Sequence, residues 1–358
     1  MDLRTESDDM ELLAAEDPDA VAVAVATDVP VHLGLVGVTG QRAMMSPFIL
    51  VSQTLGLDRT SDLMSEVDRL RALREQLFPA VRRAASFWAE RDLEGLTKAL
   101  KAVPGSEGLD WKNETPMALF DNLAGLLFEP VEQPGVRERC AEELLKLLRV
   151  ALDDHLDALG SLFAEYDSGP LEEHRRRVVG AVFGALNDVD ALFPALWAEA
   201  MDGHIDLEPY RVMRDDFAQR KSSYQDLFEL GSRTLAFTAP IANLALRGDH
   251  RAFCDGKTRT PAKARKARAF DRADWLADFP EAAPRFDAVS RHTRNDIGHA
   301  LVRLDVRNGV LVYDDGVEQN YMLFLVDWLQ AVRLSRYALD VLFVLDYTRS
   351  AVRHQQST

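Results

Sequence analysis

A short segment near the end of the chain carries residue types suited to RNA cleavage. Arg294, Asn295 and His299 form an Arg-x4-His pattern in which the Asn directly follows the Arg. An arginine stays charged at any physiological pH and can hold a phosphate, while a histidine titrates near neutrality and can move a proton to or from a ribose 2′-OH or a leaving oxygen. Because this chemistry needs no metal ion or other cofactor, we expect none.

The same spacing occurs twice, and only the setting distinguishes the two copies. With 34 Arg and 8 His in 358 residues, chance alone yields about one such pair. The second copy, Arg349 to His354, lies in a polar C-terminal tail where fraying is expected, and we interpret it as chance. The first copy is followed at once by a hairpin-like segment, 301–313, with Asn308-Gly309 between two alternating β-branched runs, and then by a long apolar helix.

The motif, its Gly298 and the following hairpin together resemble the HEPN superfamily, many of whose members carry an Arg, a polar residue, three variable residues and a His. The resemblance covers about the last 150 residues. It implies a four-helix bundle that dimerises, a composite site at the dimer interface, and metal-independent cleavage of an RNA substrate. Bacterial proteins that resemble this family often act as toxins or in abortive-infection defence against phage, which leaves room for an inhibitory or activating partner.

Helical geometry places the two charged residues of the motif on different flanks. At about 100° per residue, Arg294 falls about 140° from His299, so one straight helix does not bring both to a single phosphate. A distorted turn at Gly298 or a twofold-symmetric dimer would bring them together, and the dimer is the better explanation. The face predicted to pack on the bundle consists of Phe286, Val289, Thr293, Ile297 and Ala300.

Two other functions remain open from the residues alone. His292, Asp296 and His299 lie at positions i, i+4 and i+7, which would allow a metal site of two histidines and a carboxylate, and hence a metal-dependent phosphohydrolase. Alternatively, Arg294 and His299 cap or hydrogen-bond within a bundle, and the chain is a non-catalytic all-helical dimer that binds nucleotide, RNA or a protein. The metal site is the less favoured of these, because a single helix rarely supplies three metal ligands. The ribonuclease stays our first hypothesis.

Positive charge gathers just before the motif in an otherwise acidic chain. The net charge of −16 argues against general coating of nucleic acid. Between Arg247 and Arg272, however, nine basic residues stand against three acidic ones. This segment is expected either to guide an RNA backbone into the site or to be a solvated, partly disordered basic loop. The candidate RNA-binding residues are Lys257, Arg259, Lys263, Arg265, Lys266, Arg268 and Arg291.

Length and periodicity predict a mainly α protein with two domains. A chain of 358 residues that is 47% hydrophobic can form two cores. We expect an acidic disordered arm over 1–19, a mostly helical region of unknown role over 20–203, and an HEPN-like helical domain with a small β-hairpin over 204–358. Two short strands are predicted within 20–38. Helices are predicted over 136–163, 170–201, 207–246 (kinked near Pro240) and 319–348.

Membrane insertion and disulfide or zinc chemistry find no support in the sequence. No apolar run approaches the length of a membrane span, and the acidic N-terminus is unlike a secretory signal, so we expect a cytoplasmic protein. Cys140 and Cys254 lie far apart and offer neither a disulfide framework nor zinc spacing. We interpret both as ordinary thiols.

Overall fold

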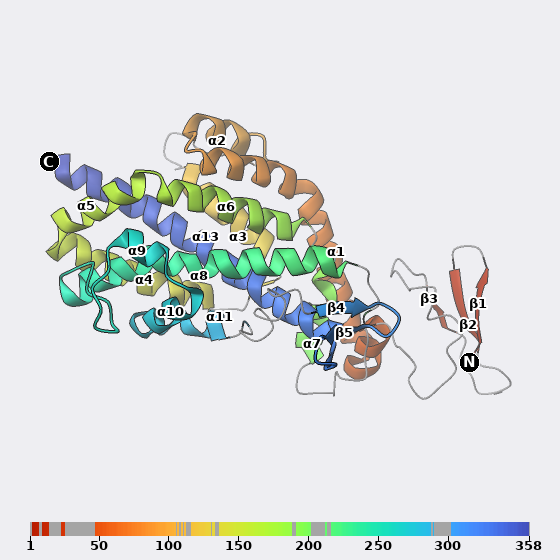
Figure 1. The fold of residues 1–358 in the computed structure, drawn as a ribbon. Helices are drawn as coiled ribbons and strands as arrows, with labels where there is room; N and C mark the ends of the chain where they lie inside the picture. The colour runs from red at the N-terminus through yellow and green to blue at the C-terminus, as the bar shows by residue number, and fades with distance from the viewer. Residues whose placement is uncertain are drawn as a thin grey trace. The chain divides into compact units, whose positions relative to one another are not determined.

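The computed structural model shows a mainly α protein with small antiparallel sheets, as predicted (Figure 1). The chain divides into two compact units, each made of three segments. Unit 1 comprises Met1–Leu63, Leu192–Gln219 and Asn295–Val326, and unit 2 comprises Met64–Ala191, Arg220–Arg294 and Asp327–Thr358. The domain boundary that the sequence predicted between residues 203 and 204 divides the chain differently from these units, and it stays a prediction. The structure describes residues 2–6, 9–13, 23–25, 47–104, 106, 109, 111, 116–129, 131–132, 136–187, 191–201, 212, 216–287, 289 and 302–357.

The described elements follow one another along the chain as labelled in Figure 1. The strands are β1 (Asp2–Glu6), β2 (Asp9–Leu13) and β3 (Val23–Val25) in one sheet, and β4 (Val302–Asp305), β5 (Val310–Tyr313) and β6 (Glu318–Asn320) in another. The helices are α1 (Pro47–Ala89), α2 (Leu93–Leu100), α3 (Pro116–Phe128), α4 (Val136–Asp154), α5 (Leu156–Asp167), α6 (Pro170–Leu186), α7 (Phe193–Met201), α8 (Phe217–Arg247), α9 (Pro261–Arg265), α10 (Ala269–Ala273), the 3-10 helix η4 (Asp274–Asp278), α11 (Ala283–Asp287) and α13 (Tyr321–Ser357).

Helix α13 runs through the interior of unit 2, alongside α6 and α8 (Figure 1). Every residue from 331 to 346 is buried, and a helix that is covered all round must be apolar on every face or pair its charges. In the core, Trp88 of α1 stacks on Phe343 of α13 with ring centroids 4.5 Å apart. The predicted buried face of the last helix is confirmed, with Phe324, Leu325, Trp328, Val332, Leu339, Leu342 and Phe343 all at most 2% exposed.

All four predicted helices have different bounds in the structure, and the last one, α13, continues through the expected frayed tail to Ser357. The helix over 136–163 is wrong as a single element, because His155 leaves helical geometry at φ −139° and ψ 37° and separates α4 from α5. The helix over 170–201 is likewise two helices, α6 and α7, and α8 begins at Phe217 rather than at 207. Apolar periodicity continues across such breaks because the helices on both sides bury residues in a core, so the pattern alone does not show where the backbone turns.

The hairpin before α13 is confirmed in unit 1. Strand β4 pairs antiparallel with β5, with Asp305 opposite Val310. The Asp305 carboxylate accepts hydrogen bonds from the backbone N and the Nδ2 of Asn308 at 3.1 and 2.8 Å, and Gly309 adopts a positive φ of 62° that favours glycine. The sequence missed the third strand, β6, and placed the helix start at Gln319. The helix begins at Tyr321, where Asn320 Oδ1 accepts a hydrogen bond from the Met322 N–H at 3.0 Å.

The N-terminal residues contain more strand than the sequence predicted. Strands β1 and β2 lie within 1–19, where a disordered arm was expected, and β3 falls within the first of the two predicted strands. The second predicted strand lies outside the described residues. In the β1–β2 pair, Arg4 stands opposite Glu11 and Leu3 opposite Leu12. Such cross-strand pairs stabilise a hairpin, so the acidic composition of this segment was a poor guide to its structure.

Candidate functional site

The predicted catalytic residues Arg294, Asn295 and His299 lie outside the described residues, as do Arg291 and the alternative metal ligands His292 and Asp296. The structure describes what precedes and follows them. Before the motif, Phe286 and Val289 are 7% and 1% exposed, as predicted for the packing face of this segment. The Phe286 ring contacts the Tyr337 ring of α13 edge-on, with centroids 5.8 Å apart. After the motif, the chain enters the β4–β5 hairpin.

The basic segment 247–272 is folded, which corrects the expectation of a partly disordered loop. Arg247 at the end of α8 makes two 2.8 Å hydrogen bonds to the Asp278 carboxylate. Arg272 is buried and donates to the backbone oxygens of Arg265 and Ala267. Both arginines join this segment to its neighbours, and the buried guanidinium of Arg272 requires these acceptors for its N–H groups.

Arg259 is also held in place within this segment. Its guanidinium pairs with both oxygens of Asp255 and lies over the rings of Phe253 and Trp275, 5.1 and 5.7 Å from their centroids. The hydrogen bonds from Arg259 hold the pKa of Asp255 at about 2. Because the Arg259 guanidinium already donates to both oxygens of Asp255 and stacks on two rings, it has few N–H groups left to bind an RNA phosphate.

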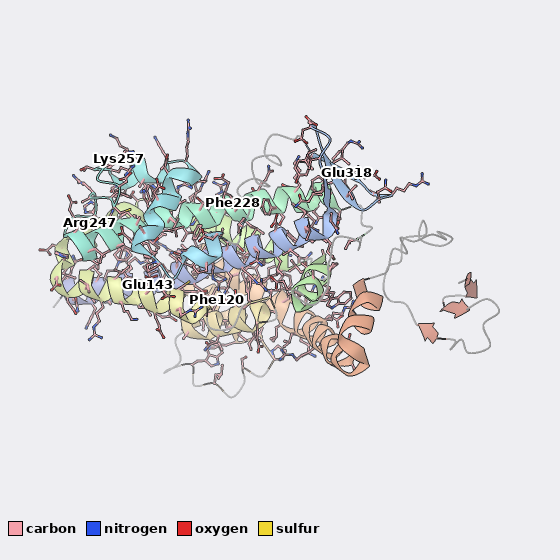
Figure 2. All side chains as sticks on the ribbon, turned by 90° about the horizontal axis from the view of Figure 1, so that it is seen from below. Phe120, Glu143, Phe228, Arg247, Lys257 and Glu318 are labelled. Atoms are coloured by element: carbon pink, nitrogen blue, oxygen red, sulfur yellow. The ribbon has the colours of Figure 1, made fainter. Side chains whose placement is uncertain are left out.

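The other candidate RNA-binding residues of the segment differ in exposure. Lys257, Lys263, Lys266 and Arg268 are exposed, and Figure 2 shows Lys257 projecting from the surface. Arg265 is half-buried and lies 3.3 Å from the Glu165 carboxylate. RNA binding by these residues stays a prediction. The exposed lysines are the best candidates for contact with RNA, because their charge faces solvent.

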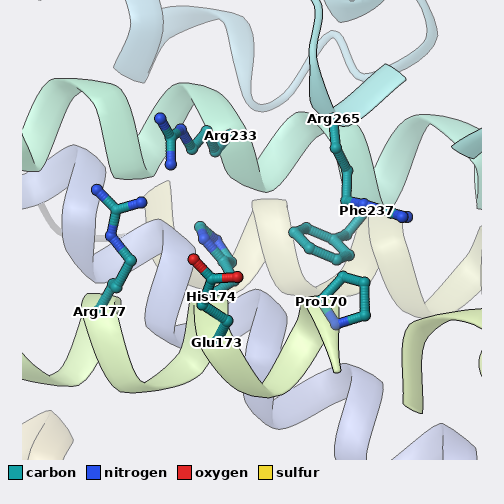
Figure 3. A pocket seen from close by; sticks show the side chains of 7 residues that line it. All are labelled: Pro170, Glu173, His174, Arg177, Arg233, Phe237 and Arg265. Carbon is teal, nitrogen blue, oxygen red and sulfur yellow. The ribbon is translucent and has the colours of Figure 1, made fainter. Parts of the chain in front are cut away.

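A pocket of about 220 Å³ opens in unit 2 where α6, α8 and α9 meet. Figure 3 shows the guanidinium groups of Arg177 and Arg233 near each other on one side of the His174 ring, with Arg265 on the other side of that ring, beyond Phe237. Helix α6 contributes residues one turn apart, so they share one face. The lining side chains are Pro170, Glu173, His174, Arg177, Arg233, Phe237 and Arg265.

His174 forms the buried part of this pocket and is neutral. The hydroxyl of Thr234 donates its hydrogen to the Leu230 carbonyl at 3.0 Å, so its oxygen accepts from His174 Nε2 at 2.9 Å. The proton of the imidazole therefore sits on Nε2. Burial, and then the charges of Arg233 and Arg177, lower the pKa of His174 from 6.5 to about 3. The ring stacks on Phe237 with centroids 5.0 Å apart.

The three arginines of the pocket differ in whether an acidic side chain neutralises their charge. Arg265 pairs with Glu165, whereas Arg177 and Arg233 have no ion pair or hydrogen-bond acceptor among the residues that the structure describes. Glu173 is the one carboxylate of the lining. The pocket thus combines three positive charges, one negative charge and a neutral histidine, an arrangement suited to anions.

Comparison with known proteins identifies no relative of this chain. No protein-family model, curated protein or solved structure matches this chain. The resemblance to the HEPN superfamily rests on the motif residues and on the hairpin that follows them.

The sequence did not single out the residues that form the pocket, apart from Arg265. His174 was not among the candidate residues. Its signal is visible in retrospect, because Pro170, His174 and Arg177 recur at one-turn spacing on α6. Arg233 belongs to α8, and no local sequence pattern predicts that α6 and α8 lie next to each other. Within the described part of the chain, no group of three or more His, Cys, Asp or Glu side chains could hold a metal ion, and no helix is long and apolar enough to cross a membrane.

Proposed function

We propose that the protein is a metal-independent endoribonuclease of HEPN type that acts as a toxin or a phage-defence effector. The observation that carries this proposal is the order of the elements around the motif. Arg294, Asn295 and His299 stand directly before a β-hairpin, 302–313, and a long buried helix, α13. The mainly α fold is in keeping with the bundle that the resemblance implies.

The chemistry follows from the three side chains. The ribose 2′-oxygen attacks the adjacent phosphorus while His299 takes the 2′-OH proton, and the bond from phosphorus to the 5′-oxygen breaks as that oxygen receives a proton. Arg294 stabilises the charge that builds on the phosphorane, and Asn295 orients the histidine or the phosphate. The products carry a 2′,3′-cyclic phosphate and a 5′-OH.

The active form in this proposal is a homodimer. On an ideal straight helix Arg294 and His299 would lie about 140° apart, so we infer that a second protomer brings an arginine and a histidine to one phosphate. Two histidines at a shared site can also divide the work, one accepting the proton from the 2′-OH and the other donating one to the leaving oxygen. A dimer that dissociates on dilution should lose activity faster than in proportion to its concentration.

The test compares wild type, His299→Ala and Arg294→Ala on total RNA, each in the presence and in the absence of EDTA. We expect cleavage by wild type with cyclic-phosphate ends, and loss of cleavage in both variants. The second Arg-x4-His copy provides a matched control, since His354 is exposed near the end of α13 and His354→Ala should cleave like wild type. Cleavage that EDTA abolishes would indicate the metal-dependent phosphohydrolase. RNA that stays intact with every protein would favour the non-catalytic binding protein.

A further inference from the structure

We propose that the pocket between α6, α8 and α9 binds a small phosphomonoester, whose phosphate is held between Arg177 and Arg233. This assignment does not rest on the proposed ribonuclease, because the pocket residues all belong to described parts of unit 2 and none belongs to the motif. Arg265 is also a candidate RNA-binding residue, but it is not one of the two arginines that hold the phosphate. The assignment also accounts for two arginines that have no acceptor among the residues that the structure describes.

The charges around the pocket favour an anion. Arg177, Arg233 and Arg265 contribute three positive charges, Glu173 contributes one negative charge, and the buried His174 contributes none. Glu165, which pairs with Arg265, offsets that arginine from outside the lining. The positive charge left over is concentrated at the two arginines that face each other in Figure 3. Like charges that share a cavity repel, and a phosphate between them turns that repulsion into attraction.

The donor chemistry favours phosphate over a single carboxylate. Each guanidinium presents its N–H groups in a planar fork that matches two oxygens of a phosphate. A phosphomonoester has three terminal oxygens, enough to serve Arg177 and Arg233 together, whereas a carboxylate has two and one charge. Arg177 is exposed and Arg233 half-buried, so both can adjust to a ligand while their helices stay packed.

The size and walls of the pocket limit what the phosphate can be attached to. A pocket of about 220 Å³ is smaller than the roughly 300 to 1,000 Å³ of sites for drug-sized ligands. The ring of Pro170 and the buried ring of Phe237 form an apolar wall beside the arginines (Figure 3). A phosphate on a small sugar or acid fits this space better than a dinucleotide or a polymer.

The test is calorimetric titration of the full chain with inorganic phosphate, ribose 5-phosphate and ribose in a buffer free of phosphate and sulfate. We expect saturable binding of ribose 5-phosphate, weaker binding of inorganic phosphate and none of ribose. Arg177→Gln and Arg233→Gln should each weaken ribose 5-phosphate binding by about tenfold to a hundredfold, the usual effect of losing a hydrogen bond to a charged group. Arg83→Gln makes the same change at an exposed arginine of α1 outside the pocket and should bind like wild type.

A variant with the opposite expected effect guards against loss of binding through misfolding. Glu173→Gln removes the carboxylate of the lining and should tighten ribose 5-phosphate binding by about threefold to fivefold. Absence of saturable binding below about 10 mM, or equal affinity in wild type and the Arg177→Gln, Arg233→Gln double variant, would overturn the proposal. Binding of a 5′-phosphorylated RNA oligonucleotide without binding of ribose 5-phosphate would overturn it too, and would assign the pocket to RNA ends.

Discussion

Arg175 of α6 donates a 2.6 Å hydrogen bond to Asp346 of α13, 171 positions further along the chain. The Arg175 side chain is fully buried and the Asp346 side chain is 11% exposed. The other carboxylate oxygen of Asp346 accepts from the Trp88 indole at 2.9 Å. One carboxylate therefore joins α1, α6 and α13 in the core of unit 2, and burial lowers the pKa of Arg175 despite the partner.

Removing this carboxylate should be strongly destabilising. Asp346→Ala leaves the Arg175 charge buried without its partner, and we expect the free energy of unfolding to fall by about 3 to 5 kcal/mol. Urea denaturation followed by circular dichroism measures the change. Asp153→Ala is the matched control, because its pair with Arg149 is exposed and should contribute no more than about 1 kcal/mol. Equal effects of the two substitutions would show that losing the buried carboxylate costs no more than losing an exposed one, and would contradict the prediction.

His174 should make the folded protein sensitive to mild acid. Its pKa is about 3 in the folded protein against 6.5 ordinarily, so below pH 6.5 the unfolded chain binds a proton that the folded chain does not. Stability from this residue is therefore fully present above pH 6.5 and falls by about 1.4 kcal/mol per pH unit below it. Between pH 7 and pH 5 the free energy of unfolding should drop by about 2 kcal/mol more in wild type than in His174→Gln. The exposed His354→Gln should retain the wild-type dependence, and identical pH profiles for all three proteins would contradict the prediction.

The contact between α8 and α13 depends on the absence of a side chain at Gly231. A Cβ at this position would clash with Cγ of Leu334, whose side chain is fully buried in the core. Gly231→Ala should therefore lower the free energy of unfolding by about 1 to 3 kcal/mol through overpacking.

Gly180 of α6 is the control, because nothing lies within 4 Å of a Cβ built there. Gly180→Ala should raise stability by about 0.5 to 1 kcal/mol, as alanine restricts the unfolded chain and favours the helix. Thermal unfolding of both variants gives the comparison. Opposite shifts are expected, and a stabilising Gly231→Ala would show that the two helices are not closely packed at this point.

The two thiols should react at different rates. Burial raises the pKa of Cys140 to about 11, and its Sγ donates to the Glu281 carbonyl at 3.1 Å. Cys254 is half-exposed, and burial raises its pKa to a lesser degree. Because the thiolate is the reactive form, a thiol reagent at pH 8 should label Cys254 slowly and Cys140 only after denaturation. Mass spectrometry of the labelled peptides distinguishes them, and rapid labelling of Cys140 in the native protein would exclude the buried position.

Local chemistry in the sequence was sufficient for several elements. Asn308-Gly309 between alternating runs predicted the β4–β5 hairpin, and the apolar stripe from Phe324 to Phe343 predicted the buried helix after it. Both depend on neighbours within a few positions, namely a turn that needs positive φ and a repeat of 3.6 residues. Helix breaks such as His155 were missed, because the apolar repeat continues on both sides of them.

The tertiary structure decided how the charged residues are used. From the sequence, Arg259 and Arg265 were equivalent members of a basic segment, and Arg175 was an unremarked helix residue. Folding pairs Arg259 with Asp255, directs Arg265 into a pocket and buries Arg175 against Asp346. The sequence by itself determined the helical class, the hairpin and the motif, because periodicity and turn chemistry are local. Which helices meet, and so which charges find partners, depends on contacts between residues tens to hundreds of positions apart, which no local pattern encodes.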